Sequence, residues 1–148
     1  MGTNKNKSQE NNEIILAQWQ TCVEMANATS QRRDSTNNIF VTLNLAIIAA
    51  VSFVWDLKSL ILLLAGVVVC SIWLLFIRNF KLLNTAKFTV IDSLERQLPA
   101  APFREEWKKL QETKKYYDGT KLERILPVTF IVLYIISAIV ITKIRFFS

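Results

Sequence analysis

The hydrophobic positions of this chain gather in three long runs that contain no formally charged side chain. The runs cover residues 39–55, 59–77 and 125–142, which is 17, 19 and 18 residues. At about 1.5 Å of rise per residue such helices reach roughly 26–28 Å, and a few flanking residues extend them across a bilayer core of roughly 30 Å. A chain of 148 residues has too little surface to bury three helices that are apolar on all sides. The pattern predicts an all-α integral membrane protein with three transmembrane helices.

A polar and then amphipathic segment precedes the first run. Residues 1–12 are predicted to form a disordered polar tail, and residues 13–37 a cytoplasmic amphipathic helix. The apolar side of this helix is formed by Ile15, Leu16, Trp19, Cys22, Val23 and Ala26. Because the helix carries no basic stripe, packing against other helices is favoured over a position among the lipid headgroups, which remains the alternative.

The helical pattern of the second run continues past its end. Residues 59–77 are predicted to span the membrane, and residues 78–98 to extend the same helix into the cytoplasm, because apolar side chains keep recurring on one broad face. Pro99 and Pro102 are expected to stop this helix, since proline cannot continue the hydrogen-bond ladder and restricts the residue before it.

The last part of the chain returns to the membrane. Residues 102–119 are predicted to form a short cytoplasmic helix with a turn at residues 118–119, and residues 120–144 to form the third span. Thr120 and Glu123 have the spacing of a capping box, which would start this last helix.

The distribution of lysine and arginine predicts the orientation of the spans. Four of these residues precede the first span, one lies between the first two spans, eleven lie within residues 78–124 and two follow residue 142. Cytoplasmic segments carry the excess of positive charge, so the N-terminus and residues 78–124 are predicted to be cytoplasmic. The turn at residues 56–58 and the C-terminus are then outside, with Trp55 at the outer interface. The net charge of +6 indicates topology and contact with membrane lipids, and nucleic acid is not an expected partner.

The residue types exclude most catalytic chemistry. Histidine is absent, which removes a histidine-based triad and a histidine-ligated metal site. Cys22 and Cys70 lie in different parts of the chain, so neither a zinc site nor a structural disulfide is indicated. Glu105 and Glu106 are adjacent and do not share a helix face, unlike paired acid and base carboxylates. The chain is predicted not to be an enzyme and to bind no cofactor.

Small and polar residues of the first span are candidates for an oligomer contact or a lumen. Thr42, Ala46 and Ala50 recur at every fourth position, and such faces permit close helix approach in lipid. Asn44 is the most informative residue, because an amide that faces lipid is costly. Its partner can be another helix of the same subunit, a neighbouring subunit or a water-filled lumen.

Three stretches of the sequence resemble the RipA family of octameric membrane proteins. They are WQTCVEMANATSQRRDSTNNIFVTLNLA, WLLFIRNFKLLNTAKFTVIDSLERQLPAAPFREEW and the T-x-LE-x-x-LP approach to the last span, and the resemblance covers about residues 17–135. It implies a small bacterial cytoplasmic-membrane (inner-membrane) protein that forms a ring-like homo-oligomer, expected to be an octamer, without a known catalytic role. A looser architectural similarity connects it to multi-pass effectors of antiphage systems, whose oligomers perturb or permeabilise the membrane.

Two functional hypotheses follow from this resemblance and from the uncharged spans. The first is a pore-forming or membrane-perturbing effector in stress or phage defence, with conduction that depends on Asn44. The alternative is a non-conducting scaffold that recruits a cytoplasmic protein partner for envelope homeostasis. Leu94 and Trp107 are the candidates for that partner surface.

Arg32 and Arg33, at the start of the first span, are predicted to serve as inside-facing topology charges. Adjacent residues lie about 100° apart on a helix, so the two guanidinium groups cannot share one environment. We expect one to meet lipid headgroups and the other to pair with a carboxylate of a cytoplasmic helix, with Asp92 and Glu95 as the candidates.

Overall fold

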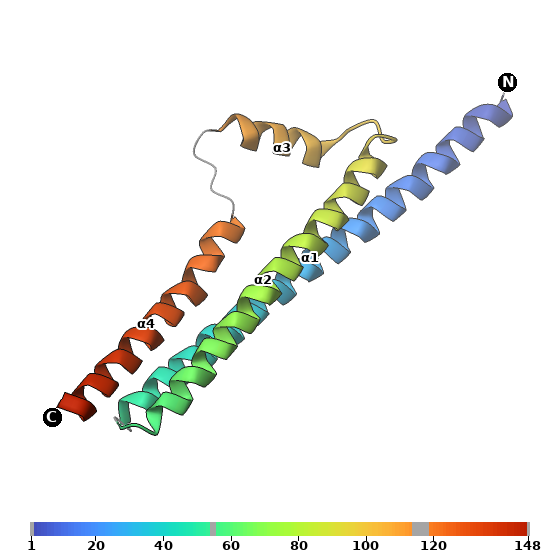
Figure 1. Cartoon of the computed structure of the whole chain (residues 1–148). Coiled ribbons are helices and arrows are strands. Elements are labelled where there is room, and N and C mark those ends of the chain that lie inside the picture. The colour runs from blue at the N-terminus through green and yellow to red at the C-terminus, as the bar shows by residue number, and fades with distance from the viewer. Residues whose placement is uncertain (1, 54–55, 114–118, 148) are drawn as a thin grey trace. The chain divides into compact units, whose positions relative to one another are not determined.

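The structure is a computed structural model. It describes the backbone of residues 2–53, 56–113 and 119–147, and within these ranges all side chains except those of residues 2–6, 8, 146 and 147. The described residues form the helices α1 (Gly2–Phe53), α2 (Ser59–Glu95), α3 (Pro102–Glu112) and α4 (Gly119–Phe147), shown in Figure 1. No strand occurs within these ranges, and the predicted all-α fold is confirmed.

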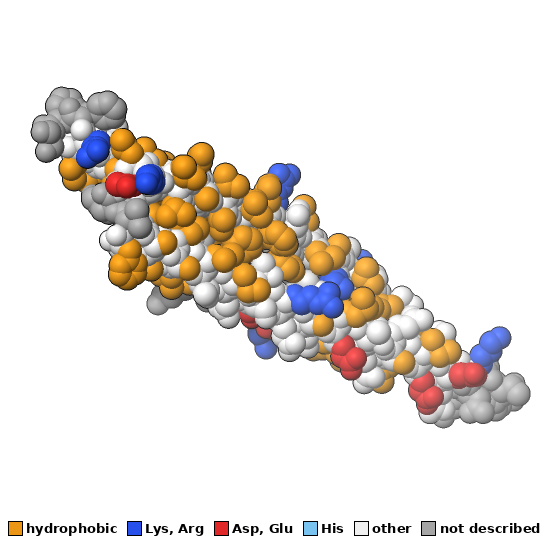
Figure 2. All heavy atoms as spheres, turned by 90° about the horizontal axis from the view of Figure 1, so that it is seen from below, with side chains coloured by type: hydrophobic (Ala, Val, Ile, Leu, Met, Phe, Trp, Pro, Cys, Tyr) orange, Lys and Arg blue, Asp and Glu red, His pale blue; other side chains and the backbone are white. Residues whose placement is uncertain are grey.

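Three of the helices are long and apolar enough to cross a membrane. They are Gln9–Phe53 within α1, Ser59–Glu95 in α2 and Gly119–Arg145 within α4. Only 17%, 28% and 17% of their most apolar stretches is buried inside the chain, so most of this surface faces outward. Figure 2 shows hydrophobic side chains gathered densely over one half of the visible face. Apolar surface of this extent suits contact with lipid, and the predicted number of three spans is confirmed.

The first helix is longer than the sequence analysis predicts. α1 runs without a break from Gly2 to Phe53, so it includes residues 2–12, which differs from the predicted disordered tail. It also joins the predicted amphipathic helix and the first span into one element. No proline or glycine occurs between Thr3 and Phe53, so nothing in this stretch interrupts the helical hydrogen-bond ladder. Trp55 lies outside the described residues.

The second helix passes from the apolar run into its polar continuation without a break. α2 ends at Glu95, three residues before the predicted end at residue 98. The backbone N–H groups of Gln97 and Leu98 donate to the carbonyls of Leu94 and Glu95 at 3.0 and 3.1 Å. These bonds have the spacing of a 3₁₀ turn, so the chain tightens and leaves the helix just before the first proline.

The fourth helix begins earlier than its predicted capping box. α4 starts at Gly119, which places Thr120 inside the first turn, and the prediction that Thr120 is the N-cap is wrong. Asp118, the other residue of the predicted turn, lies outside the described residues. Pro127 is fully buried within α4, where its missing N–H removes one bond to the carbonyl of Glu123, and the helix continues to Phe147 all the same.

The helices contribute to two compact units. Unit 1 consists of Met1–Arg32 and Phe80–Tyr117, and unit 2 of Arg33–Asn79 and Asp118–Ser148. Unit 2 holds the three uncharged runs, and unit 1 holds the polar part of α1, the end of α2, and α3. Each unit has its own buried side chains and is described separately.

In unit 2, α1 and α4 run parallel. Arg33 pairs with Glu123 and Asn44 pairs with Tyr134, and both pairs have the same sequence separation of 90. A constant separation means that the two helices advance together in the same direction. They therefore cross a membrane with the same orientation.

α1 and α2 of unit 2 run antiparallel. The separation of bonded residues falls from 36 for Asn37 and Trp73 to 26 for Asn44 and Cys70 toward the turn that joins the helices. In the turn, the Asp56 carboxylate accepts the backbone N–H two residues later at 2.7 Å. The three spans thus alternate in direction along the chain, as a short turn and a long return segment require.

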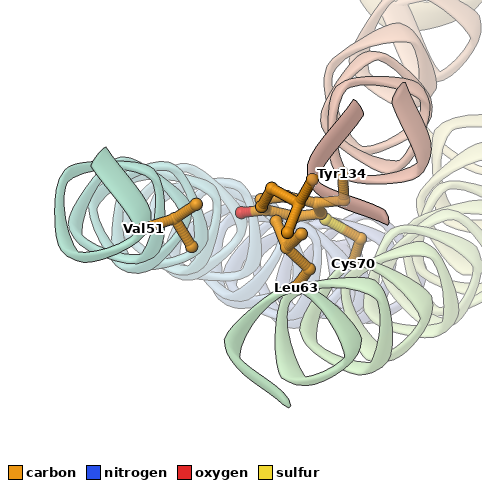
Figure 3. Close-up of a cluster of buried hydrophobic side chains, with 5 residues drawn as sticks. Val51, Leu63, Cys70 and Tyr134 are labelled. Atoms are coloured by element: carbon orange, nitrogen blue, oxygen red, sulfur yellow. The ribbon is translucent and has the colours of Figure 1, made fainter. Parts of the chain in front are cut away.

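The core of unit 2 brings together one side of each span. It consists of Val51, Leu63, Cys70, Tyr134 and Ile141. Figure 3 shows Leu63, Cys70 and Tyr134 pointing toward one another, with Val51 pointing toward them from α1. Gly66 makes room for the tyrosine ring, because a Cβ atom at this position would lie 2.6 Å from Tyr134 Cε2. The absence of a side chain at Gly66 therefore allows α2 and α4 to approach closely.

In unit 1, α3 packs against α1 and the end of α2 through aromatic rings. The ring of Phe103 lies 5.9 Å from that of Trp19 and 5.8 Å from that of Phe88, measured between centroids. Ile15 and Ala26 of α1 are buried, as is Ile91 of α2. The amphipathic part of α1 thus packs against protein, the alternative that its composition favours.

The contact at Gly66 predicts that even a methyl group there destabilises unit 2. In Gly66→Ala the Tyr134 ring must shift, and we expect the free energy of unfolding to fall by about 1–3 kcal/mol despite the better helix propensity of alanine. Equilibrium unfolding in mixed micelles, followed by circular dichroism, measures this. Gly119→Ala is the matched control, because no atom lies within 4 Å of its added Cβ. Equal stability of Gly66→Ala and the unmodified chain would contradict the close packing at Gly66.

Candidate functional site

The centre of unit 2 is a buried hydrogen-bonded cluster with one residue from each span. The Tyr134 hydroxyl donates to Asn44 Oδ1 at 2.7 Å, and the Cys70 thiol donates to the same oxygen at 3.0 Å. Asn44 Nδ2 in turn donates to the backbone carbonyl of Phe40 at 2.7 Å. Asn44 and Cys70 are completely buried, and Tyr134 is 1% exposed. The cluster therefore joins α1, α2 and α4 inside an otherwise apolar interior.

This cluster settles the partner of Asn44 within the subunit. Among the alternatives that the sequence left open, interhelical hydrogen bonding inside one chain is the one observed. The assignment of Asn44 as a lumen or oligomer residue is wrong. Its carbonyl oxygen accepts two bonds and its amide donates one, so the costly polar group is satisfied without water or a second chain.

An aromatic layer lies beside the cluster. Trp73 is completely buried, and its indole N–H donates to Asn37 Oδ1 at 2.8 Å. Phe40 stacks on Trp73 at a centroid distance of 5.6 Å and an interplanar angle of 5°. The Trp73 ring also lies 6.4 Å from that of Phe130, measured between centroids. Rings from all three spans therefore continue the packing from the polar cluster toward the charged end of unit 2.

A charged layer forms that end of unit 2. Arg33 donates through Nε and Nη2 to Glu123 Oε2 at 2.9 and 2.6 Å, and through Nη2 to the Thr120 hydroxyl at 3.1 Å. The side chains of Arg33 and Glu123 are only 16% and 27% exposed. Half-buried, charge-assisted bonds of this geometry fix the start of α4 against α1.

The prediction that one of Arg32 and Arg33 pairs with a carboxylate is confirmed, and its proposed partner is wrong. Arg33 binds Glu123 rather than Asp92 or Glu95, while Arg32 is exposed. The physical reason is the register of the helices: with α1 and α4 parallel, the first turn of α4 meets α1 at Arg33. The spacing of Thr120 and Glu123, which suggested a cap, instead presents a hydroxyl and a carboxylate to one guanidinium group.

Asp92 and Glu95 instead hold α3 within unit 1. Asp92 Oδ1 accepts bonds from Arg104 Nε and Nη2 at 2.9 and 2.8 Å, and Asp92 Oδ2 accepts from Arg96 at 2.9 Å. Hydrogen bonds from Arg104 and then from Arg96 lower the pKa of Asp92 below its usual range. Because the pKa of Asp92 is lowered, the contribution of its bonds with Arg104 and Arg96 to stability is complete at neutral pH. This contribution is lost as the pH falls through the lowered pKa of Asp92.

Glu95 caps the first turn of α3. It is 1% exposed, and its two carboxylate oxygens accept the backbone N–H groups of Phe103 and Arg104, each at 3.2 Å. These are two of the N–H groups that a helix N-terminus leaves without a partner, and the helix dipole favours an anion there. Glu95 is therefore a structural residue that positions α3.

Of the remaining candidate residues, all but Leu94 are exposed. Thr42, Ala46 and Ala50 are all exposed on α1, and the Thr42 hydroxyl donates to the carbonyl of Asn38 at 2.9 Å. Trp107 of α3 is 53% exposed, while Leu94 is half-buried. The three small residues of α1 thus remain accessible to a second chain, and so does Trp107.

Sequence reasoning missed several residues of the site. Tyr134, Gly66 and Glu123 each depend on a partner from another helix, which the sequence does not identify. Two signals were present: Gly66 is the only glycine in the three uncharged runs, and Tyr134 is the only tyrosine in them. An isolated glycine and an isolated hydroxyl in an apolar run call for a specific neighbour, which the sequence alone does not identify.

The arrangement provides hydrogen bonds between the helices. The buried polar groups at the centre of unit 2 are an amide, a thiol and a phenol; the thiol and the phenol donate to the amide oxygen, and the amide nitrogen donates to the backbone. In the part of the chain that the structure describes, no group of three or more Cys, Asp or Glu side chains lies close enough to hold a metal ion. The absence of enzyme activity stays a prediction from the sequence.

The Asn44 cluster predicts energetic coupling between α1 and α4. Asn44→Leu and Tyr134→Phe each remove one side of the same hydrogen bond, so the double variant should be less destabilised than the sum of the two. We expect a coupling energy of about 0.5–1.5 kcal/mol, the range for such bonds in membrane proteins, from unfolding in mixed micelles.

Thr42→Val combined with Tyr134→Phe is the matched control for that coupling. The Thr42 hydroxyl is exposed and bonded within its own helix, so the two effects should add within about 0.5 kcal/mol. Additive effects of Asn44→Leu and Tyr134→Phe would contradict the cluster.

Comparison with known families gave a match over most of the chain. The model of the Octameric membrane protein family (8xMP) matches residues 16–143, which is most of the chain. Comparison with curated proteins and with solved structures gave no match. The name RipA does not occur in the description of the matched family, whereas the resemblance to octameric membrane proteins is confirmed. The three apolar helices agree with that description, and the chain belongs to the octameric membrane protein family.

Proposed function

We propose that this protein is a non-conducting, homo-oligomeric membrane scaffold that presents its cytoplasmic helices to a protein partner. The observation that carries the proposal is that the buried amide, thiol and phenol at the centre of the spans are hydrogen-bonded inside the subunit. The Cys70 thiol and the Tyr134 hydroxyl both donate directly to Asn44 Oδ1. The family description supports the homo-oligomer, with eight copies as the expected number.

The exposed hydroxyls of the spans support a lipid-facing surface. Thr42, Ser52, Ser71 and Thr129 each donate to the carbonyl four residues earlier in the same helix, at distances of 2.8–2.9 Å. Such back-bonding satisfies the hydroxyl proton without an external partner. These positions therefore need no water-filled lumen.

The scaffold is proposed to lie in the bacterial cytoplasmic membrane. The fifteen lysine and arginine residues before the first span and within residues 78–124, against three elsewhere, support a cytoplasmic N-terminus and middle segment. In that orientation α3 faces the cytoplasm, and a role in envelope homeostasis needs a partner there. The exposed Trp107 suits recognition by such a partner, because tryptophan is enriched at the centre of protein interfaces.

A pore-forming or membrane-perturbing effector, in stress or phage defence, is the second candidate. One observation favours it: Thr42 is exposed on the same side of α1 as the small residues Ala46 and Ala50. A ring of subunits that turned this side toward its axis would place threonine hydroxyls around a narrow opening. Each hydroxyl oxygen keeps a lone pair that can accept a hydrogen bond from water or coordinate a cation.

Ion flux separates the two candidates. We expect purified oligomer in liposomes to pass ions no faster than protein-free liposomes, because the Asn44 cluster and the back-bonded hydroxyls of the spans find their hydrogen-bond partners inside the subunit. The measurement is ion flux together with single-channel recording in planar bilayers. A defined conductance that Thr42→Val lowers, and that the matched control Thr129→Val leaves unchanged, would overturn the scaffold and support the pore.

Loss of the exposed indole tests the partner surface. We expect Trp107→Ala to reduce the crosslinked partner recovered from native membranes at least tenfold, since truncation of a central aromatic anchor costs about 2 kcal/mol or more. Lys108→Ala, at the next position, which is also exposed, should leave recovery unchanged, and both variants should insert into the membrane normally. Crosslinking that captures no specific protein would count against a scaffold.

A further inference from the structure

The end of α2 exposes a row of apolar side chains within unit 1. We name as the α2 stripe the four exposed residues Leu82, Leu83, Ala86 and Val90. The two leucines are 59% and 47% exposed and the valine is 49% exposed. At about 100° per residue the four lie within roughly 100° of one another around the helix. The buried Ile91 and Glu95, which pack inside unit 1, lie on other sides of α2.

Lipid is not the natural cover of the α2 stripe. Unit 1 exposes many charged side chains, including Glu10, Glu13, Glu24, Glu105, Glu106, Lys108, Lys109 and Glu112. Charged side chains are costly in the hydrocarbon core, so this unit belongs in water or among headgroups. A row of half-exposed leucine and valine side chains in that setting marks a surface that another protein covers.

We propose that the α2 stripe is a contact between subunits, covered by a second copy of this chain. The proposal rests on the homo-oligomer of the proposed function and names the surface through which copies meet. The match to a family described as octameric points to the same chain as the occupant. α3, with its exposed Trp107, remains available to a different protein.

The chemistry around the stripe fits close packing with another helix. The stripe itself contains no polar side chain. Beside it, the hydroxyls of Thr85 and Thr89 donate to the carbonyls of Lys81 and Thr85, each at 2.9 Å. These hydroxyl protons are therefore already hydrogen-bonded within α2. A second helix that covers this side would leave no hydroxyl donor without a partner. Ala86 has a small side chain, which permits the close approach of a helix from the adjoining copy.

Symmetry determines which experiment is informative. In a closed ring each subunit uses two different surfaces, so the stripe of one copy meets another surface of the next. A cysteine placed in the stripe would then not face its own equivalent. A photo-reactive residue reports whichever surface lies against it, and a charge introduced into the stripe tests whether the contact holds the oligomer together.

Charge substitution is the first arm of the test. We expect Leu82→Glu and Val90→Glu each to reduce the oligomeric fraction at least tenfold in native mass spectrometry of the detergent-solubilised protein, because the contact would bury an unpaired carboxylate. Met25→Glu is the matched control: it changes an apolar residue of α1 in unit 1 that is 54% exposed, and it should leave the oligomer intact. Circular dichroism verifies that all three variants fold.

Photo-crosslinking in native membranes is the second arm. We expect p-benzoylphenylalanine at Ala86 to give a product of twice the chain mass, whose crosslinked peptide comes from this chain. The same residue at the exposed Gln20 of α1 should give at least tenfold less product. Oligomers that survive both charge substitutions, or a crosslinked peptide from a different protein, would overturn the assignment of the stripe. A wild-type chain that is monomeric would instead overturn the proposed homo-oligomer.

Discussion

An amide in an apolar interior has to be satisfied by neighbouring groups, and this requirement at Asn44 organises unit 2. Its side-chain oxygen accepts hydrogen bonds from the Tyr134 hydroxyl of α4 and the Cys70 thiol of α2. Its nitrogen donates to the backbone carbonyl of Phe40 in α1. Lipid-facing hydrophobic residues give little preference for one helix arrangement over another, since lipid tails are as apolar as the side chains. A directional hydrogen bond supplies the preference that hydrophobicity lacks.

The same requirement explains why two different contacts can share one register. Arg33 and Asn44 are eleven residues apart (44 minus 33), which is about three helical turns, so both lie on one side of α1. Their partners Glu123 and Tyr134 are also eleven residues apart on α4 (134 minus 123), so one parallel alignment satisfies both pairs. The ion pair lies at the end of the apolar run and the amide within it, so a slip along the helix axis would break both.

The sequence predicts the elements well and their partners poorly, for a physical reason. Uncharged runs of membrane length are a property of the chain alone, as is the proline-terminated helix before residue 99. The partner of Arg33 is a property of the register between α1 and α4, and the sequence offers Asp92, Glu95 and Glu123 as equal carboxylates. Asn44 shows the same division: its need for a partner was predictable, and the choice of Tyr134 was not. The need for glycine at residue 66 likewise becomes clear only when the position of the Tyr134 ring on α4 is known.

The two units meet their surroundings in different ways, and this difference bears on assembly. In the three uncharged runs of unit 2 the exposed surface is mostly apolar, and hydroxyls such as those of Thr42 and Thr129 bond within their own helix, so lipid is a suitable cover for this surface. In unit 1 the apolar α2 stripe belongs to a unit with many exposed charged side chains, which places it in water. Contact between this apolar surface and water is unfavourable. The driving force for association is therefore larger per unit of apolar area in unit 1, because the hydrophobic effect acts in water and has no counterpart between helices in lipid. Subunits that meet first through their water-exposed helices can assemble without any charged group in the membrane. Small residues such as Ala46 and Ala50 then permit the spans to follow.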